Sequence, residues 1–460
     1  MNQFAIYKQL PVFFQNLLCT IQGYRLEKQR YNKDYYEIYD SLLQSDKWTA
    51  QQILSYKEDC LSRIIEYASK HCLYYKQRYN QLGLSPKDFK EIDDLNKFPI
   101  LSKEDIRSNW KGMISDEYDV RQLIPYHTSG STGKALDFYW SSYSLQYYWA
   151  IVWRGRQRFG IYKGDRHLNF TGKIVVPIEQ YKPPYWRYNR ALNQYMFNMQ
   201  HLTPQKIKSV VEFINHCNFK FFVGYPSIMN TFANLVLEQG LEITHIPEYI
   251  FSSAEKMYEN QQQTICKAFP GTKIVEHYGF SENAASASKC RNNVYHEDFE
   301  LGHLELNNPV NAGNGFSGSM LATGFQNFAM PFIRYEIGDI GTFSKEKCSC
   351  GICSQVITDI EGRSEDYIIT PEGSHIMRMD YIFKGTSSIK ECQIVQRELG
   401  SIIIRIVKRD NYSIQIENDL KYAIKEMISP SLKVYFEYVN EISRTKSGKF
   451  KAVVSELNKK

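Results

Sequence analysis

Alternating helix and strand patterns between residues 200 and 280 limit the fold of this chain more than any other feature of its sequence. Apolar residues at helical spacing precede a short apolar run at 219–223, which predicts a helix followed by a buried strand. Further strands are expected at 249–251 and 272–276, with a helix closed by Gly240 between the first two. Repeated strand–helix units imply a parallel sheet flanked by helices. The first helix is indicated by Thr203 as N-cap, Pro204 as first residue, and Ile207, Val210, Val211 and Ile214 on one face.

Each predicted strand runs into a polar or glycine-containing stretch. In open parallel sheets, ligands bind at the carboxyl ends of the strands. The sequence therefore predicts a binding site along this edge of the sheet. The stretches are Gly224-Tyr225-Pro226-Ser227, Ser252-Ser253-Ala254-Glu255 and His277-Tyr278-Gly279.

A loop rich in hydroxyl residues and glycine lies nearer the N-terminus. Two glycines allow its backbone to turn several N–H groups toward one point, and a lysine adds a positive charge. Such a loop suits the phosphates of a nucleotide, although the same composition is typical of a plain surface loop. The spacing differs from that of the kinase or GTPase P-loop, since only two residues separate the glycines and Ala135 follows the lysine. The loop comprises Thr128, Ser129, Gly130, Ser131, Thr132, Gly133 and Lys134.

Composition and charge restrict the class of protein. The chain has 460 residues, enough for two or three domains, and its net charge of +6 does not indicate nucleic-acid binding. No signal peptide and no run of about 18 apolar residues is visible, so we expect a cytoplasmic protein without a membrane span. Its ten cysteines are then thiols or metal ligands. The apolar segment 1–24 predicts a helix packed on the core, or one that contacts a membrane surface or a partner.

The pattern changes along the chain in a way that predicts two domains. Residues 1 to about 100 predict a helical lead-in, and residues 300–360, with frequent glycines, predict a β-rich subdomain. We expect an α/β fold with a large N-terminal domain, 1–362, of β-α-β sheets plus that subdomain, and a small α+β domain, 363–460. The small domain is indicated by strand patterns at 402–407 and 434–439 and a helical pattern at 416–427.

Five motifs follow one another along the chain: loop 128–134, Tyr278-Gly279-Phe280-Ser281-Glu282, Tyr335-Glu336-Ile337-Gly338-Asp339, Gly362-Arg363 and residues 443–449. In this order they make the sequence similar to the adenylate-forming superfamily, which includes acyl-CoA synthetases, luciferases and peptide-synthetase adenylation domains. The resemblance runs from about residue 50 to the end. Within the superfamily the chain most resembles the phenylacetate–CoA ligase branch and its capsule-biosynthesis relatives, through residues 224–227 and 331–335.

The resemblance implies a nucleotide site that binds ATP. The loop is expected to hold the β and γ phosphates, Glu282 to hold Mg²⁺, and Asp339 to accept hydrogen bonds from the ribose. The alternatives are a solvated glutamate and a turn aspartate. The remaining nucleotide-site residues are expected to be Ser253, Ala254, Glu255, His277, Tyr278, Gly279, Phe280, Ser281 and Arg363.

The small domain is expected to be mobile and to carry the catalytic lysine. Lys449 can reach a carboxylate oxygen and the α-phosphate together, while the alternative is a solvated basic tail. By the resemblance, this domain rotates about a hinge marked by Arg363 and by Glu365 or Asp366, which removes Lys449 after adenylation.

A separate set of cysteines and a histidine predicts a metal site. Cys290 and His296 lie close in sequence, and Cys348 and Cys350 supply two more ligands, with Cys353 left over. Four such ligands can close a tetrahedral, structural zinc site. The alternative is a set of unrelated reduced cysteines.

These features predict an AMP-forming ligase that activates an organic acid with ATP and passes the acyl group to coenzyme A. Transfer to an amine of a sugar or amino acid, and a non-catalytic nucleotide-binding scaffold in polysaccharide assembly, are the alternatives. An aromatic acid would suit a pocket near Tyr225, Pro226 and Phe251, although these residues equally suit a core. A homodimer remains open.

Overall fold

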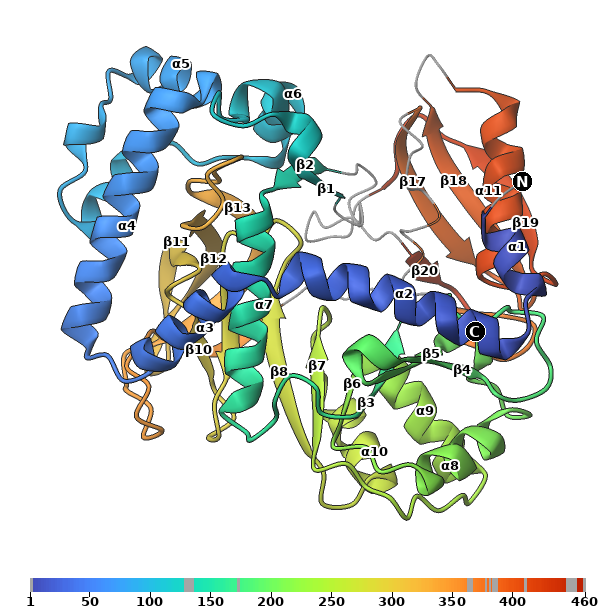
Figure 1. The fold of residues 1–460 in the computed structure, drawn as a ribbon. Coiled ribbons are helices and arrows are strands. Elements are labelled where there is room, and N and C mark those ends of the chain that lie inside the picture. The colour runs from blue at the N-terminus through green and yellow to red at the C-terminus, as the bar shows by residue number, and fades with distance from the viewer. Residues whose placement is uncertain are drawn as a thin grey trace.

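The computed structural model describes residues 3–127, 136–171, 174–361, 367–376, 379, 382, 388–408, 412–443 and 453–457 (Figure 1). A 12-stranded mixed sheet runs through the N-terminal part, and a small four-stranded unit lies beside it. The α/β class predicted from the sequence is confirmed. The helices are α1 Gln3–Gln9, α2 Val12–Arg30, α3 Lys33–Ser45, α4 Ala50–His71, α5 Leu73–Leu82, α6 Lys103–Met113, α7 Ser142–Gln157, α8 Ile207–His216, α9 Pro226–Glu238, α10 Glu259–Ala268 and α11 Ile414–Met427.

The large sheet has the order β11-β12-β13-β14-β10-β9-β8-β7-β6-β3-β5-β4. Strands β5, β3, β6, β7 and β8 are parallel, and the others pair antiparallel. The strands are β3 His167–Thr171, β4 Trp186–Asn189, β5 Gln194–Asn198, β6 Phe221–Gly224, β7 Tyr249–Ser253, β8 Lys273–Gly279, β9 Ser286–Lys289, β10 Tyr295–Glu297, β11 Gly302–Ala312, β12 Gly315–Gly324, β13 Tyr335–Ser344 and β14 Val356–Glu361.

Alternation along the parallel strands places helices on both faces. Phe221 and Phe251 join a cluster with residues of α3 and α7, whereas Phe222 and Ile250 point to the opposite face and pack with α8, α9 and α10. Side chains of a strand alternate between faces, so a strand covered on both sides is apolar throughout. This is why the sequence reads as short continuous apolar runs between helices.

The glycine-rich region does not form a separate sheet. Strands β9–β14 continue the parallel part without interruption, because β9 pairs with β8 from His277 to Gly279. That pairing also extends β8 through residues that we expected to lie beyond the strand end. A second boundary differs as well: α8 begins at Ile207, after a turn in which the carbonyl of Thr203 accepts from the N–H groups of Lys206 and Ile207.

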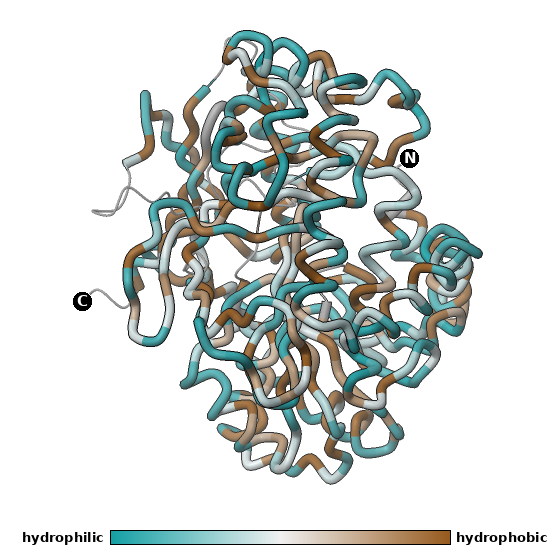
Figure 2. Tube along the Cα trace, turned by 90° about the vertical axis from the view of Figure 1, so that its left-hand side faces the viewer, coloured by the Kyte–Doolittle hydropathy of each residue, from teal (hydrophilic) through white to brown (hydrophobic). Residues whose placement is uncertain are grey.

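The N-terminal segment is helical, as predicted, but it divides at Pro11 into α1 and α2. Helix α2 crosses the molecule and passes β4 closely: a Cβ added to Gly23 would lie 2.0 Å from Asn189 Oδ1. Much of its apolar surface is nevertheless exposed, with Phe13 73% exposed. Hydrophobic and hydrophilic segments alternate at short intervals along the trace (Figure 2), and among the described residues no helix is long and apolar enough to span a membrane.

The C-terminal unit contains a sheet of order β19-β18-β17-β20 with α11 packed on it. Its contacts with the rest of the chain are polar as well as apolar. Gln200 Nε2 donates to the Met427 carbonyl over 2.7 Å, and Lys8 pairs with Glu426 at 2.6 Å. Its strands are β15 Ile368–Ile369, β16 His375–Ile376, β17 Ile389–Gln396, β18 Ser401–Lys408, β19 Lys433–Tyr438 and β20 Val453–Ser455.

Candidate functional site

The carboxyl ends of β6, β7 and β8 lie side by side, as the sequence predicts. Gly224 pairs with Ser252, and Ser253 pairs with His277. Three buried polar atoms at this edge have no hydrogen-bond partner among the described residues: Ser227 Oγ, Ser252 Oγ and His277 Nε2. Leaving a buried polar atom unsatisfied costs about 1–3 kcal/mol. These three atoms can therefore form hydrogen bonds with a ligand placed at this edge.

The turn after β7 is fixed by a helix end. Glu255 Oε2 accepts a 3.1 Å hydrogen bond from the Ser227 N–H in the first turn of α9. A carboxylate is favoured there because the first N–H groups of a helix have no partner within the helix. The same turn holds Ala254 in a left-handed conformation, φ 70°, which costs about 1–2 kcal/mol for a residue other than glycine. Ser253, Ala254 and Glu255 thus occupy a constrained turn at the predicted edge.

The 278–282 and 335–339 motifs come together. Tyr278 Oη donates to Asp339 Oδ2 over 3.0 Å, and the buried Tyr335 hydroxyl donates to Glu282 Oε1 in a short hydrogen bond. Both carboxylates are held from one side by a tyrosine on the partner motif. Phe280 packs between the two motifs, its ring 6.0 Å from that of Tyr278 and 6.3 Å from that of Tyr335.

Several predicted residues lie outside the described part of the chain. Strand β1, Ile124–His127, pairs with β2, Asp137–Trp140, and a short hydrogen bond joins the His127 imidazole to the Asp137 carboxylate. These strands flank the predicted phosphate loop. The undescribed residues are Thr128, Ser129, Gly130, Ser131, Thr132, Gly133, Lys134, Arg363, Glu365, Asp366 and Lys449, so their roles stay predictions.

The acid pocket predicted from three residues stays a prediction, and the structure shows where each of them packs. Phe251 belongs to the cluster formed with α3 and α7, whereas Tyr225 packs against the cluster on the opposite face, and Pro226 is buried at the start of α9. Two residues near the site were not identified from the sequence. Tyr335 could have been found as the first residue of its motif, whereas nothing in the sequence marks Arg156, whose guanidinium lies 5.5 Å from the Phe251 ring centroid.

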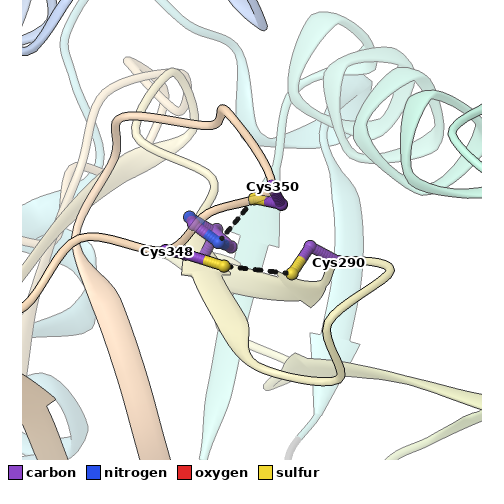
Figure 3. A group of neighbouring side chains, drawn as sticks. Cys290, Cys348 and Cys350 are labelled. Atoms are coloured by element: carbon purple, nitrogen blue, oxygen red, sulfur yellow. Dashed lines mark hydrogen bonds between the residues drawn. The ribbon is translucent and has the colours of Figure 1, made fainter.

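The predicted metal ligands gather in one place (Figure 3). The ligand atoms of Cys290, His296, Cys348 and Cys350 all lie within 4.8 Å of one another, while the thiol of Cys353 stays outside this set. Cys290 Sγ is 3.8 Å from Cys348 Sγ, and Cys350 Sγ is 3.3 Å from His296 Nε2. Tetrahedral zinc with Zn–S bonds of about 2.3 Å holds its sulfur ligands roughly 3.8 Å apart, whereas a disulfide needs about 2.05 Å. The cluster thus fits zinc and does not fit a disulfide.

Backbone groups support the same interpretation. The N–H groups of Asn292 and Ile352 each donate to a cluster sulfur, Cys290 Sγ and Cys350 Sγ, at 3.4 Å. Such hydrogen bonds stabilise thiolates and orient metal ligands. The cluster joins the β9–β10 connection to the segment before β14, so a metal there would tie two parts of the antiparallel region together.

Comparisons with known proteins agree with this geometry. The CapK C-terminal domain model matches residues 368–456. Protein CapK of Staphylococcus aureus is 28% identical over 98% of this chain and 99% of its own length, and phenylacetate-coenzyme A ligase of Thermus thermophilus is 20% identical over 88% and 96%. A solved 2-hydroxyisobutyryl-CoA ligase, in complex with 2-HIB-AMP and CoA, has a TM-score of 0.59 at 17% identity, covering 90% of this chain and 92% of that one. The chain is therefore homologous to CapK and to the phenylacetate–coenzyme A ligases, the branch of the adenylate-forming superfamily that its motifs predict.

Proposed function

We propose that this protein is an AMP-forming acid ligase, which joins an organic acid to AMP and then transfers the acyl group to coenzyme A. The observation that carries the proposal is the hydrogen-bonded union of the 278–282 and 335–339 motifs at the carboxyl edge of the sheet. Homology to ligases of that activity, over most of both chains, supports it. We place the reaction in the cytoplasm and, by the resemblance to capsule-biosynthesis relatives, in surface-polysaccharide metabolism.

In the first half-reaction a carboxylate oxygen attacks the α-phosphorus of ATP. The bond to the bridging oxygen breaks, and pyrophosphate leaves with its electrons. Asp339 would hold the ribose. The hydrogen bond that its carboxylate accepts from the Tyr278 hydroxyl keeps that carboxylate in position. Glu282 would hold Mg²⁺, which neutralises phosphate charge, and its buried carboxylate offers the hard oxygen ligand that this ion prefers.

In the second half-reaction the sulfur of coenzyme A attacks the acyl carbonyl, the bond between the acyl carbon and the phosphate oxygen breaks, and AMP leaves while the thiol proton passes to solvent. An experiment can distinguish coenzyme A from an amine as the acceptor of the acyl group. Purified protein is incubated with ATP and a panel of acids, and AMP and pyrophosphate are measured, before coenzyme A or candidate amines are added. We expect thioester formation with coenzyme A. Amide formation in its place would identify the alternative acceptor, and release of ADP and phosphate would contradict the proposed reaction.

Lys449 gives the sharpest test of the mechanism. Replacing it with alanine removes the cation proposed to stabilise charge at the carboxylate and α-phosphate, so we expect adenylation to fall about 10²–10³-fold with unchanged thermal stability. The exposed Lys433 of the same domain is the control, and Lys433→Ala should retain full activity. Equal adenylation by the Lys449→Ala variant and the wild type would show that another group does this work.

We also propose that the Cys290, His296, Cys348 and Cys350 cluster binds structural zinc. The four side chains would fill every position of a tetrahedral ion, which would leave none open for catalysis. Mass spectrometry of the native protein should find one zinc per chain, and a chelator or Cys348→Ser should remove it and lower Tm. Cys353→Ser is the matched control, because that exposed thiol lies outside the ligand set. Full stability with no bound zinc would refute the proposal.

A further inference from the structure

Arg156 is a cation surrounded by aromatic rings. It lies in the last turn of α7, and its guanidinium carbon is 4.7 Å from the ring centroid of Trp153, 5.4 Å from that of Phe221 and 5.5 Å from that of Phe251. Attraction to ring faces compensates part of the loss of water around a buried charge. It does not provide a hydrogen-bond acceptor, and a guanidinium has five N–H donors.

No carboxylate of the described residues pairs with this guanidinium, and no described residue accepts a hydrogen bond from it. Arg154, two residues earlier, is the opposite case, because it pairs with Asp46, Asp298 and Glu300. Burial lowers the pKa of Arg156 to about 10, so the group still carries its charge at neutral pH. Arg156 is partly exposed, whereas Arg154 is 1% exposed, so part of the Arg156 surface stays accessible.

The guanidinium faces the strands that form the proposed acid-activating edge. Phe251 lies two residues before Ser253 on β7, and Phe221 lies three residues before Gly224 on β6. At about 3.3 Å per residue, the aromatic surroundings of Arg156 lie roughly 7–10 Å below the strand ends. Arg156 is also close enough to affect the edge electrostatically: burial lowers the pKa of His277, Asp298 partly opposes this, and the charge of Arg156 lowers the pKa.

We propose that Arg156 binds a second anionic group, a carboxylate or a phosphate, at the far end of the acid that is activated at this edge. The inference rests on the proposed function and narrows its substrate to an acid with two anionic ends. One end is adenylated at the strand ends, and the other forms a two-pronged pair with the guanidinium between the rings. A planar fork of N–H donors matches both carboxylate and phosphate oxygens.

Matched acids test the proposal. Each pair consists of a monocarboxylic acid and its analogue with a second carboxylate, or with a phosphate, at the opposite end. For wild-type protein we expect kcat/KM for AMP formation to be at least 10-fold higher with one of the dianionic analogues, and the carboxylate and phosphate arms identify which group is bound. Arg156→Met should abolish this preference mainly through KM, and Arg156→Lys should restore part of it.

Arg121→Met is the matched control, since it removes the same charge from a side chain that is 85% exposed, and it should keep the wild-type preference. Equal kcat/KM of the wild type for both members of every pair would overturn the inference and leave the ligase function intact. If no acid yields AMP, the proposed function fails, and calorimetry with the same acids still tests Arg156. Binding of dianions by the wild type but not by Arg156→Met supports the site, and equal binding by both refutes it. The wild-type comparison decides the matter even if Arg156→Met does not fold.

Discussion

Arg154 and Arg156 lie two residues apart on one helix and have opposite surroundings. Arg154 is 1% exposed, and its guanidinium contacts three carboxylates, two of which are held further by serine hydroxyls. Among the described residues, the Arg156 guanidinium contacts aromatic rings and no carboxylate, and the residue is partly exposed. A fully buried charge left without its counter-charge costs several kcal/mol, whereas a partly exposed cation keeps part of its hydration. The first arrangement therefore serves stability, and the second is available for binding.

The largest effect expected from this contrast is on folding. Arg154→Met leaves Asp298 and Glu300 buried without a counter-charge, so we expect the free energy of unfolding to fall by about 3–5 kcal/mol. Urea titration at pH 7 measures it. Arg156→Met should change the free energy of unfolding by less than about 1 kcal/mol, because no carboxylate of the described residues would lose its partner. Equal losses for the two variants would break the comparison.

A second buried ion pair, between Lys57 and Glu297, predicts that the stability of the fold falls in acid. Burial disfavours the Glu297 carboxylate, but Lys57 at 2.8 Å, His303 and the N–H of Leu304 together outweigh it and hold the pKa of Glu297 at about 2, below its usual 4.5. A lowered carboxyl pKa contributes stability that is complete above about pH 4.5 and is lost as pH falls toward 2. This contribution is about 3 kcal/mol.

The Lys57→Met variant distinguishes the stability that the Lys57–Glu297 pair contributes from general unfolding in acid. The variant should be less stable than the wild type at pH 7, and the gap between the two should narrow between pH 4.5 and 2, as Glu297 is protonated in both. Urea midpoints measured at several pH values in that window provide the measurement. A gap that stays constant down to pH 2 would mean that the ion pair does not set the pKa of Glu297.

The smallest effect is expected at the open edge. Tyr278→Phe removes one hydrogen bond to Asp339, so we expect KM for ATP to rise about fivefold, corresponding to about 1 kcal/mol, with little change in Tm. Tyr162→Phe, at an exposed tyrosine, is the control. A fall in Tm without a change in KM for ATP would show that Tyr278 stabilises the fold and does not contribute to ATP binding.

The elements that are determined by local pattern were predictable from the sequence. Strands β6 and β7, helix α9 and the edge they form were expected, because continuous apolar runs and a closing Gly240 are local signals. The meeting of the cysteines with His296 was also expected, since few other chemistries require that set.

What depends on pairing between distant segments was not predictable. The pattern of residues 300–360 indicates strands but does not say that β9 extends the parallel sheet by pairing with β8. Arg156 was missed for a related reason. Its sequence neighbours Arg154 and Arg158 are similar basic residues, and only the packing of α7 against β6 and β7 separates the paired arginines from the open one.

Lys8 gives the first helix a part in the behaviour of the last domain. Its ammonium pairs with Glu179 at 3.0 Å and with Glu426 at 2.6 Å, so the short N-terminal helix connects the large domain to the C-terminal unit. Any rotation of the C-terminal unit away from its present position must break the Lys8–Glu426 ion pair and the hydrogen bond from Gln200 to the Met427 carbonyl. A fusion partner or deletion placed before residue 10 would consequently alter the rate of that rotation, even though the segment is remote in sequence from every proposed catalytic group.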